Sequence, residues 1–158
     1  MISLRTAVAA ILSGLTEELE ALESIAAATR DEATSSETRA EGQYDTRATE
    51  ASYLARGQAM RIVELRRLTA WLESLDPDRS LPDPVVQVGA LVQITGARQD
   101  LLFLAPIGGA KAEVDGQRIR VISPASPLGA AMAELTVGDA FEVDSPGGIL
   151  EYEITAIR

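Results

Sequence analysis

The side chains of this chain that could do chemistry are carboxylates, because its 158 residues include neither His nor Cys. Thiol nucleophiles, histidine bases and zinc sites with nitrogen or sulfur ligands are therefore excluded, and the sequence predicts no autonomous hydrolase. The acids that stand out lie between residues 31 and 50, at Asp31, Glu32, Glu37, Glu41, Asp45 and Glu50. On their own, such acids are most simply the solvated face of a helical element.

The elements that carry these acids are predicted by two apolar stripes that mirror each other about a point between Gln43 and Tyr44. The first stripe is Leu12, Leu15, Leu19, Leu22 and Ile25, and the second is Ile62, Leu65, Leu68, Leu72 and Leu75. Steps of three and four residues keep these side chains on one face of an α-helix. Two stripes in mirror register predict an antiparallel coiled-coil hairpin, with its tip at Gly42 to Asp45, about 45 Å from Leu12.

The hairpin is expected to end at Asp76-Pro77-Asp78, because proline disfavours helical geometry in the residue before it. We therefore predict a hairpin over 1–76, a short stiff linker over 77–84 and a C-terminal domain over 85–158. Because the mirrored stripe is satisfied within one chain, we expect a monomer and not a self-associating coiled-coil adaptor.

The sequence pattern of the C-terminal domain predicts a small sheet with one helix. Short apolar segments follow one another, and the last of them alternates with period two from Leu150 to Ile157. Asp144 to Gly148 has the composition of a hairpin turn. Ser126 followed by Pro127 is a helix-start pairing. The predicted fold class is α+β: a helical hairpin followed by a small antiparallel β domain with one short helix.

The net charge of −10 argues against direct binding to DNA or RNA, which needs clustered Lys and Arg. Ala7 to Leu15 behind Arg5 has the outline of a secretory leader, but the leucine register runs through it and Glu17 and Glu18 follow at once. No segment approaches the roughly 20 apolar residues of a membrane span. We therefore expect a protein without a leader or a membrane anchor.

Several short motifs occur in a fixed order along the chain. They are Glu50 to Ala55, Ile122 to Gly129, Val137-Gly138-Asp139, Ser145 to Gly148 and Tyr152-Glu153-Ile154. Together with a long hairpin and a Pro-rich linker, this order resembles the bacterial Gre transcript-cleavage factors, the GreA/GreB-like transcription elongation factors. The resemblance implies that the C-terminal domain is similar to the FK506-binding proteins, that is, FKBP-like.

The resemblance also implies a cytoplasmic protein that binds RNA polymerase and has no catalytic activity or cofactor of its own. In this family the globular domain docks at the rim of the polymerase's secondary channel, here through Ser126, Pro127 and Leu128. Ala125 departs from the family, which often has Asp before its Ser-Pro, so docking could use a different contact. The hairpin threads the channel, and acids at its tip help to hold a magnesium ion shared with the polymerase's active centre, where backtracked RNA is hydrolysed.

The tip also departs from the family. Cleavage-competent members have an Asp and a Glu three residues apart before an Ala-x-Tyr, and with Ala51-x-Tyr53 as that anchor the two positions fall on Thr46 and Thr49. The nearest carboxylates are Asp45, Glu50 and, on the opposite arm, Glu41. We take these three as the metal ligands implied by the resemblance, since Mg²⁺ prefers one or two carboxylates from a protein and a paired metal activates water.

Two alternative functions and the role of four arginines stay open at this point. A Gre-like factor could occupy the channel and inhibit or modulate transcription without cleavage. The second helix carries Arg56, Arg61, Arg66 and Arg67, which could face the channel wall or RNA or be ordinary surface charge. A prolyl isomerase is suggested only by analogy of fold, and the domain has too few aromatic residues to line a proline pocket.

Overall fold

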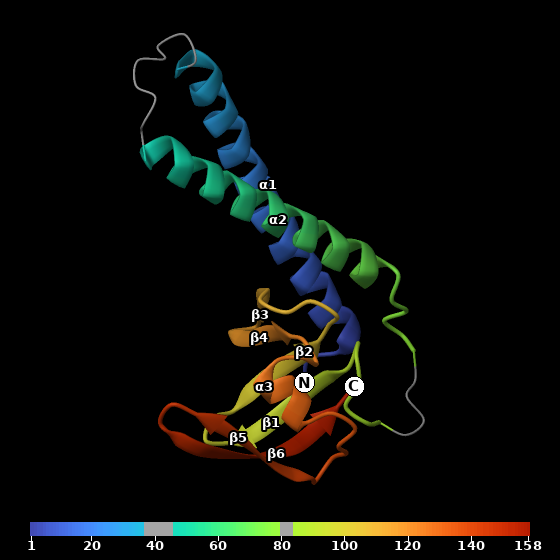
Figure 1. Cartoon of the computed structure of the whole chain (residues 1–158). Helices are drawn as coiled ribbons and strands as arrows, with labels where there is room; N and C mark the ends of the chain where they lie inside the picture. Colours follow the sequence, from blue (N-terminus) through green and yellow to red (C-terminus); the bar gives the residue numbers. More distant parts are fainter. Residues whose placement is uncertain (37–45, 80–83) are drawn as a thin grey trace.

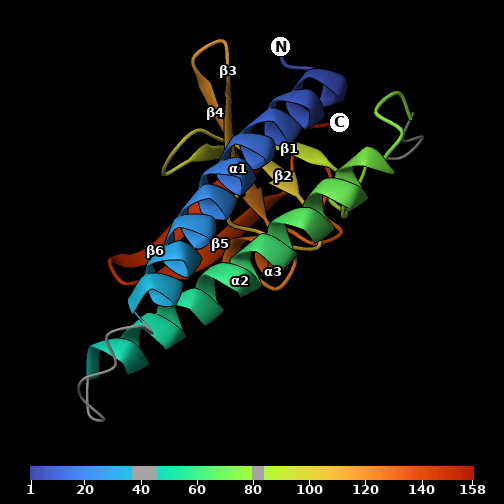
Figure 2. The same cartoon turned by 90° about the horizontal axis from the view of Figure 1, so that it is seen from above.

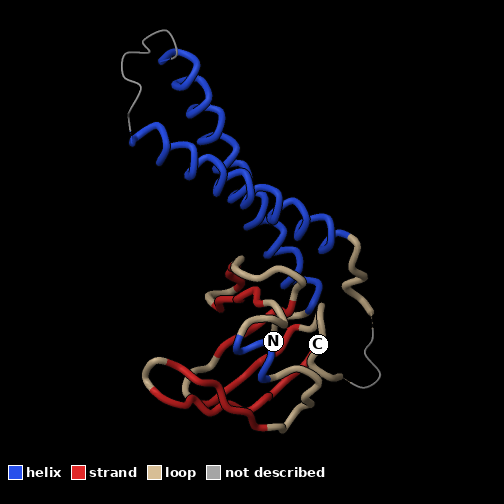
Figure 3. The backbone as a smooth tube through the Cα atoms, viewed as in Figure 1, coloured by secondary structure: helices blue, strands red, loops and turns tan. Residues whose placement is uncertain are grey.

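The computed structural model describes residues 1–36, 46–79 and 84–158 and shows a helical hairpin standing on a six-stranded sheet (Figure 1). The hairpin consists of α1 (Leu4–Ser36) and α2 (Thr46–Glu73), and the short helix α3 (Pro127–Ala131) lies beside the sheet. The strands are β1 (Leu91–Gly96), β2 (Asp100–Leu104), β3 (Lys111–Val114), β4 (Gln117–Ile122), β5 (Ala140–Ser145) and β6 (Gly148–Ile157). The predicted fold class, α+β with a helical hairpin before a mostly antiparallel β domain, is confirmed (Figure 3).

The strand order is β3-β4-β2-β1-β6-β5, and neighbouring strands are antiparallel with one exception. β2 and β4 are parallel, because the chain crosses from β2 to the sheet edge at β3 and β4 then returns beside β2. The hairpin turn predicted between β5 and β6 is confirmed: Ser145 lies opposite Gly148, and the Ser145 hydroxyl donates to the Gly148 carbonyl at 2.7 Å. The two-residue connection fits the Pro-Gly turn chemistry.

The end of α2 is fixed by the acidic Asp-Pro-Asp segment. The Asp78 N–H donates to the Asp76 carboxylate at 3.0 Å, and the Arg79 N–H donates to the Asp76 carbonyl at 3.3 Å. The Asp78 carboxylate also forms an ion pair with Arg5, at the start of α1. The same segment therefore stops the second helix and ties it to the first. The predicted linker, 77–84, lies partly outside the described residues.

Both faces of the sheet are buried, and alternate residues of β2 serve the two sides. Leu101 and Phe103 belong to a core shared with the base of the hairpin, whereas Leu102 and Leu104 belong to a second core. The second core includes Met132, just after α3, and Tyr152 and Ile154 on β6. The period of two along an extended strand explains this division. The hairpin and the sheet are thus joined by one continuous hydrophobic core.

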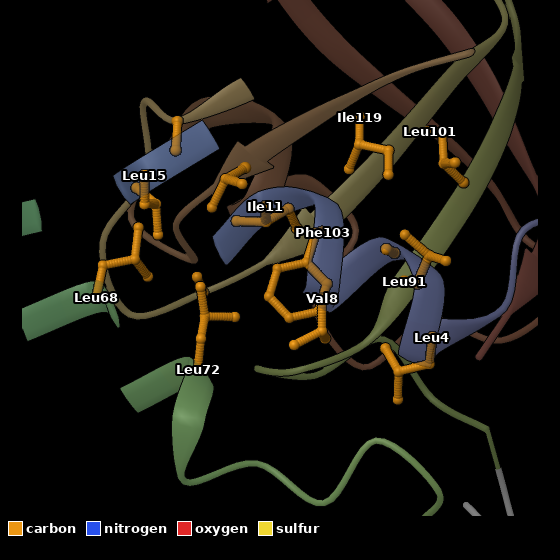
Figure 4. Packing of buried hydrophobic residues seen from close by; sticks show 14 of the residues in the cluster. Leu4, Val8, Ile11, Leu15, Leu68, Leu72, Leu91, Leu101, Phe103 and Ile119 are labelled. Atoms are coloured by element: carbon orange, nitrogen blue, oxygen red, sulfur yellow. The ribbon is translucent and has the colours of Figure 1, made fainter. Parts of the chain in front are cut away.

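The centre of the shared core is Phe103, which is completely buried. Figure 4 shows its ring among Val8 and Ile11 of α1 and Leu72 of α2. The ring of Trp71 lies 6.1 Å from it, centroid to centroid, with the planes tilted by 55°. Tilted aromatic pairs of this kind add to the stabilisation from burial alone. Side chains from both arms therefore pack around Phe103, and α1 also lies along β3.

The leucine stripes face inward as predicted, but their burial falls along the arms. Leu15 and Leu65 are buried, Leu19 and Leu22 are partly buried, and Ile25 is 50% exposed. Farther out, a groove between the arms is lined by Ala26, Thr29, Arg30, Ala55, Gln58, Ala59 and Ile62. Small residues at this seam bury little apolar area, so the distal half of the hairpin has little core of its own. The mirror point itself lies outside the described residues.

We expect Leu68→Ala to lower the free energy of unfolding by about 2–4 kcal/mol, because Leu68 is only 2% exposed in the shared core and the substitution leaves a cavity. Leu54→Ala, on the same helix but 67% exposed, should change stability by less than about 0.5 kcal/mol. Urea titration followed by Trp71 fluorescence measures both. Equal losses in the two variants would contradict the shared core.

Candidate functional site

The candidate site at the hairpin tip is described only in part. Glu41 and Asp45, two of the three predicted metal ligands, lie outside the described residues. The third, Glu50, is exposed in the second turn of α2, toward the end of the hairpin remote from the sheet (Figure 1). Within the ranges that the structure describes, no three Asp or Glu side chains lie together as a metal site. The structure thus places Glu50 where a partner could reach it and leaves the ligand set a prediction.

A shallow hollow opens beside Glu50 on α2. It is lined by Thr49, Ser52, Tyr53 and Arg56. Neighbouring residues on a helix are rotated by about 100°, so Thr49 faces this hollow while Glu50 lies at its flank. A carboxylate at position 49 would therefore face the hollow, whereas the natural carboxylate at position 50 points elsewhere around the helix.

Two of the five arginines on α2 tie the arms of the hairpin together. The Arg61 guanidinium pairs with the Glu18 carboxylate on α1 at 2.9 Å and lies 3.5 Å from Glu64 on its own helix. Arg66 pairs with Glu23 on α1. These pairs are partly exposed, so each contributes little to stability, but they fix which sides of the helices face each other. Arg66 remains 63% exposed and Arg61 27% exposed, so both are surface charges that pair across the arms.

The predicted docking segment divides into residues that hold the fold and residues that are exposed. The Ser126 hydroxyl accepts a hydrogen bond from the Gly129 N–H at 3.1 Å and donates one to the Ser123 carbonyl at 2.7 Å, so it caps α3 as predicted. Leu128 is half-buried against the second core. Pro127 is exposed, as is Ala125 beside the cap. A partner would therefore meet Pro127 directly and Ser126 only in part.

Gly129 explains why the Ser-Pro-Leu-Gly motif ends in glycine. Its α-carbon lies so close to the preceding turn that a Cβ atom would sit 2.1 Å from the Ser123 carbonyl oxygen. Contacts this short do not occur without a shift of the backbone. The motif is thus a close-packed cap that holds the exposed proline in place.

The Val137-Gly138-Asp139 motif forms a turn whose carboxylate has a defined partner. One oxygen of Asp139 accepts hydrogen bonds from the Thr136 N–H at 2.7 Å and from the Thr136 hydroxyl at 2.9 Å. The backbone bond and then the hydroxyl bond lower the pKa of Asp139 below its usual 3.8. Gly138 has φ of +93°, which its missing side chain permits. This motif is therefore explained by turn chemistry at the start of β5.

None of the helices in the described part of the chain has an apolar stretch long enough to cross a membrane.

The class of protein defined by the fold and the site is a helical hairpin fixed on a small β domain with a capped Ser-Pro segment. The sequence family "Transcription elongation factor, GreA/GreB, C-term" matches residues 81–158. The C-terminal half of the chain therefore belongs to this Gre-factor family.

Named relatives agree with this assignment. The chain is 36% identical over 99 residues to transcription elongation factor GreA of Rhodospirillum rubrum, and 34% identical over 99 residues to GreA of Agrobacterium fabrum. Each match covers 62% of this chain and 60% of the relative. The chain thus spans about 60% of the length of the curated relatives it matches.

Solved structures of related proteins match over most of the chain but with low scores. The crystal structure of GreA factor homolog 1 (Gfh1) of Thermus thermophilus covers 93% of this chain and 94% of its own, with 18% identity and a TM-score of 0.39. GreA/GreB from Nitrosomonas europaea covers 70% and 92%, with 22% identity and a TM-score of 0.37. Because these TM-scores are low, the family assignment depends on the sequence matches.

We expect Asp139→Asn to lower stability at neutral pH and to match the wild type in acid. Because the folded pKa is below the unfolded value of 3.8, the ionised group stabilises the fold fully above pH 3.8, and this stabilisation is lost as the pH falls through the lower folded pKa. Urea midpoints measured from about pH 6 to about pH 2 should therefore converge. A difference between the two proteins that does not change with pH would refute this role.

The matched control is Asp144→Asn. The Asp144 carboxylate lies exposed on β5 and accepts no hydrogen bond from the described residues, so its replacement should not reproduce the loss at neutral pH.

Proposed function

We propose that this protein is a transcription elongation factor that binds RNA polymerase, inserts its hairpin into the secondary channel and assists cleavage of backtracked RNA. The observation that carries the proposal is a Gre-family C-terminal domain joined through a shared core to a long hairpin with an exposed acid, Glu50, toward its far end. The proposal includes a cytoplasmic location and a monomeric state.

The shape of the molecule supports a division of labour between its ends. The 33 residues of α1 span about 50 Å, which lets the tip act far from the sheet. Because the base of the hairpin is buried against the sheet, docking of the C-terminal domain also sets the direction of the arms. The docking contact would centre on exposed Pro127, with Ser126 and Leu128 holding it in position.

The chemistry proposed for the tip is the supply of oxygen ligands. Asp45 and Glu50, with Glu41 from the other arm, would contribute carboxylates to a magnesium ion of the polymerase's active centre, where a second ion activates water and stabilises the leaving oxygen. The factor would then have no catalytic activity and no cofactor of its own. Hard carboxylate oxygens are the donors that magnesium prefers, so the residue types fit this use.

A second candidate is a regulator that occupies the channel without supporting cleavage. The observation that favours it is the position of Thr49, which faces the hollow on α2 where a carboxylate would be expected in a cleavage-competent member.

Prolyl isomerase activity is not supported in the same way. Phe103, Phe141 and Tyr152 are all buried, and the last two stack on each other at 5.7 Å. The aromatic side chains of the domain therefore fill its cores and cannot line a proline pocket.

To test cleavage, backtracked elongation complexes are mixed with the protein and magnesium, and RNA shortening is followed. Asp45→Asn and Glu50→Gln keep similar shapes and remove charge, so each should lower the cleavage rate steeply, and added magnesium should partly restore it because a weaker site needs more ion. Polymerase binding should persist in both. Glu20→Gln, an exposed acid on α1 nearer the sheet, should cleave like the wild type.

The converse variant carries Thr46→Asp and Thr49→Glu, which restores the family's three-residue spacing. If spacing limits the natural protein, this variant should cleave faster than the wild type in the same assay. Cleavage by the variant alone, with none by the wild type at any magnesium concentration, would reject the cleavage role and favour the non-cleaving regulator.

A further inference from the structure

The outward side of α2 carries a row of exposed apolar and basic side chains. This row, the outer stripe, consists of Tyr53, Arg56, Met60, Val63 and Arg67. Steps of three and four residues place all five on one side of the helix. The apolar members are large and strongly exposed: Tyr53 is 69%, Met60 62% and Val63 46% exposed.

The outer stripe lies away from the stripe that holds the hairpin together. Leu65, Leu68 and Leu72 are buried in the core shared with α1 and the sheet, so that side of α2 is already occupied. Figure 2 shows α2 beside α1 above the sheet. A helix with apolar residues on two sides needs a partner on each side. In the described structure, only the side with the leucines is covered. On α1, by contrast, Ile25, at 50%, is the one large apolar side chain classed as exposed among the residues whose burial is described.

The composition of the outer stripe is that of a protein interface. Tyr, Met and Arg are enriched at protein interfaces, and Tyr and Arg are also frequent among the residues that contribute most to binding. Three exposed apolar side chains in one row differ from the single scattered ones that are normal on a surface, and they favour an interaction site. Thr49, Ser52, Tyr53 and Arg56 also line a shallow hollow at the distal end of the stripe, which offers a seat for a protruding side chain.

The charge of the outer stripe indicates what it binds. Arg56 and Arg67 have no ion-pair partner among the described residues, although the chain as a whole has a net charge of −10. Two isolated cations about 16 Å apart are too few for the counterion release that drives phosphate binding. Interleaved with three apolar side chains, they complement a protein surface whose carboxylates flank apolar groups.

We propose that the outer stripe of α2 binds an acidic protein surface with apolar residues, the wall of the polymerase channel that receives the hairpin. This inference rests on the proposed function and adds to it which arm carries the contact. α2 meets the wall, and α1 serves as its support. The stripe begins beside Glu50 and continues toward the sheet, so the same contact fixes the rotation of α2 about its axis and hence the direction of the tip acids.

The test compares binding of the full-length protein to core RNA polymerase freed of nucleic acid. Met60→Gln/Val63→Gln keeps helix-favouring residues and removes the apolar contact, and it should weaken the Kd on the order of tenfold. The matched control is Ile25→Gln on α1, which removes an exposed apolar side chain outside the stripe and should change the Kd less than about twofold. Circular dichroism confirms that both variants retain their helices.

The charge half of the proposal is tested with Arg56→Gln/Arg67→Gln, which should weaken binding at low salt and reduce its dependence on salt. Arg118→Gln, an exposed arginine on β4, is the control and should change neither. If the wild type binds polymerase and both stripe variants bind with the same Kd, the proposal for the outer stripe is wrong while the proposed function stands. If the variants bind more weakly than the wild type only when RNA is present, the stripe contacts RNA and the proposal is wrong. If the wild type does not bind polymerase at all, the proposed function is wrong as well.

Discussion

The structure depends on one contact, the burial of the hairpin's base against Phe103 of β2. Val8 and Ile11 from α1 and Trp71 and Leu72 from α2 share a core with this residue, so both arms contribute to its burial. Because side chains alternate along β2, its neighbours Leu102 and Leu104 anchor the opposite core. Strand β2 therefore links the two cores, and α1 also packs along the edge strand β3. A surface that binds the sheet would thereby set the direction of the far end of α1, roughly 50 Å from its start.

Stability is concentrated at the base and decreases toward the tip. The fully buried leucines lie between the sheet and the level of Leu15 on α1 and Leu65 on α2. Farther from the sheet, the arms are joined by small residues and by partly exposed ion pairs such as Glu23–Arg66. Exposed pairs of this kind contribute little and are screened by salt. A slender distal half suits entry into a narrow space. Its exposed outer stripe on α2 is then completed by the partner and not by the chain itself.

Much of the fold could be predicted from the sequence because its signals are local. The spacing of Leu15, Leu68 and Leu72, the turn at Ser145 to Gly148 and the cap at Ser126 each act over a few residues. The parallel pairing of β2 with β4 could not be predicted, since it is set by a crossover and not by a local pattern. The stripe analysis also assigned Leu15 and Leu72 to the hairpin alone, and no local signal shows that they contact the sheet as well. For the site, family motifs indicated the tip and the docking segment. The structural uses of Gly129 and Asp139 depend on neighbours that only the folded chain brings together.

The central claim, that the hairpin carries its tip to the polymerase's active centre, is tested most directly by site-specific cross-linking. A photoreactive residue at Gln43, between the two helices, is compared with one at Ile149, exposed at the start of β6. With core polymerase freed of nucleic acid, position 43 should label segments around the active centre, and position 149 should label only the outer surface or nothing. Labelling from position 43 that is absent, confined to the outer surface or dependent on added DNA would contradict the account.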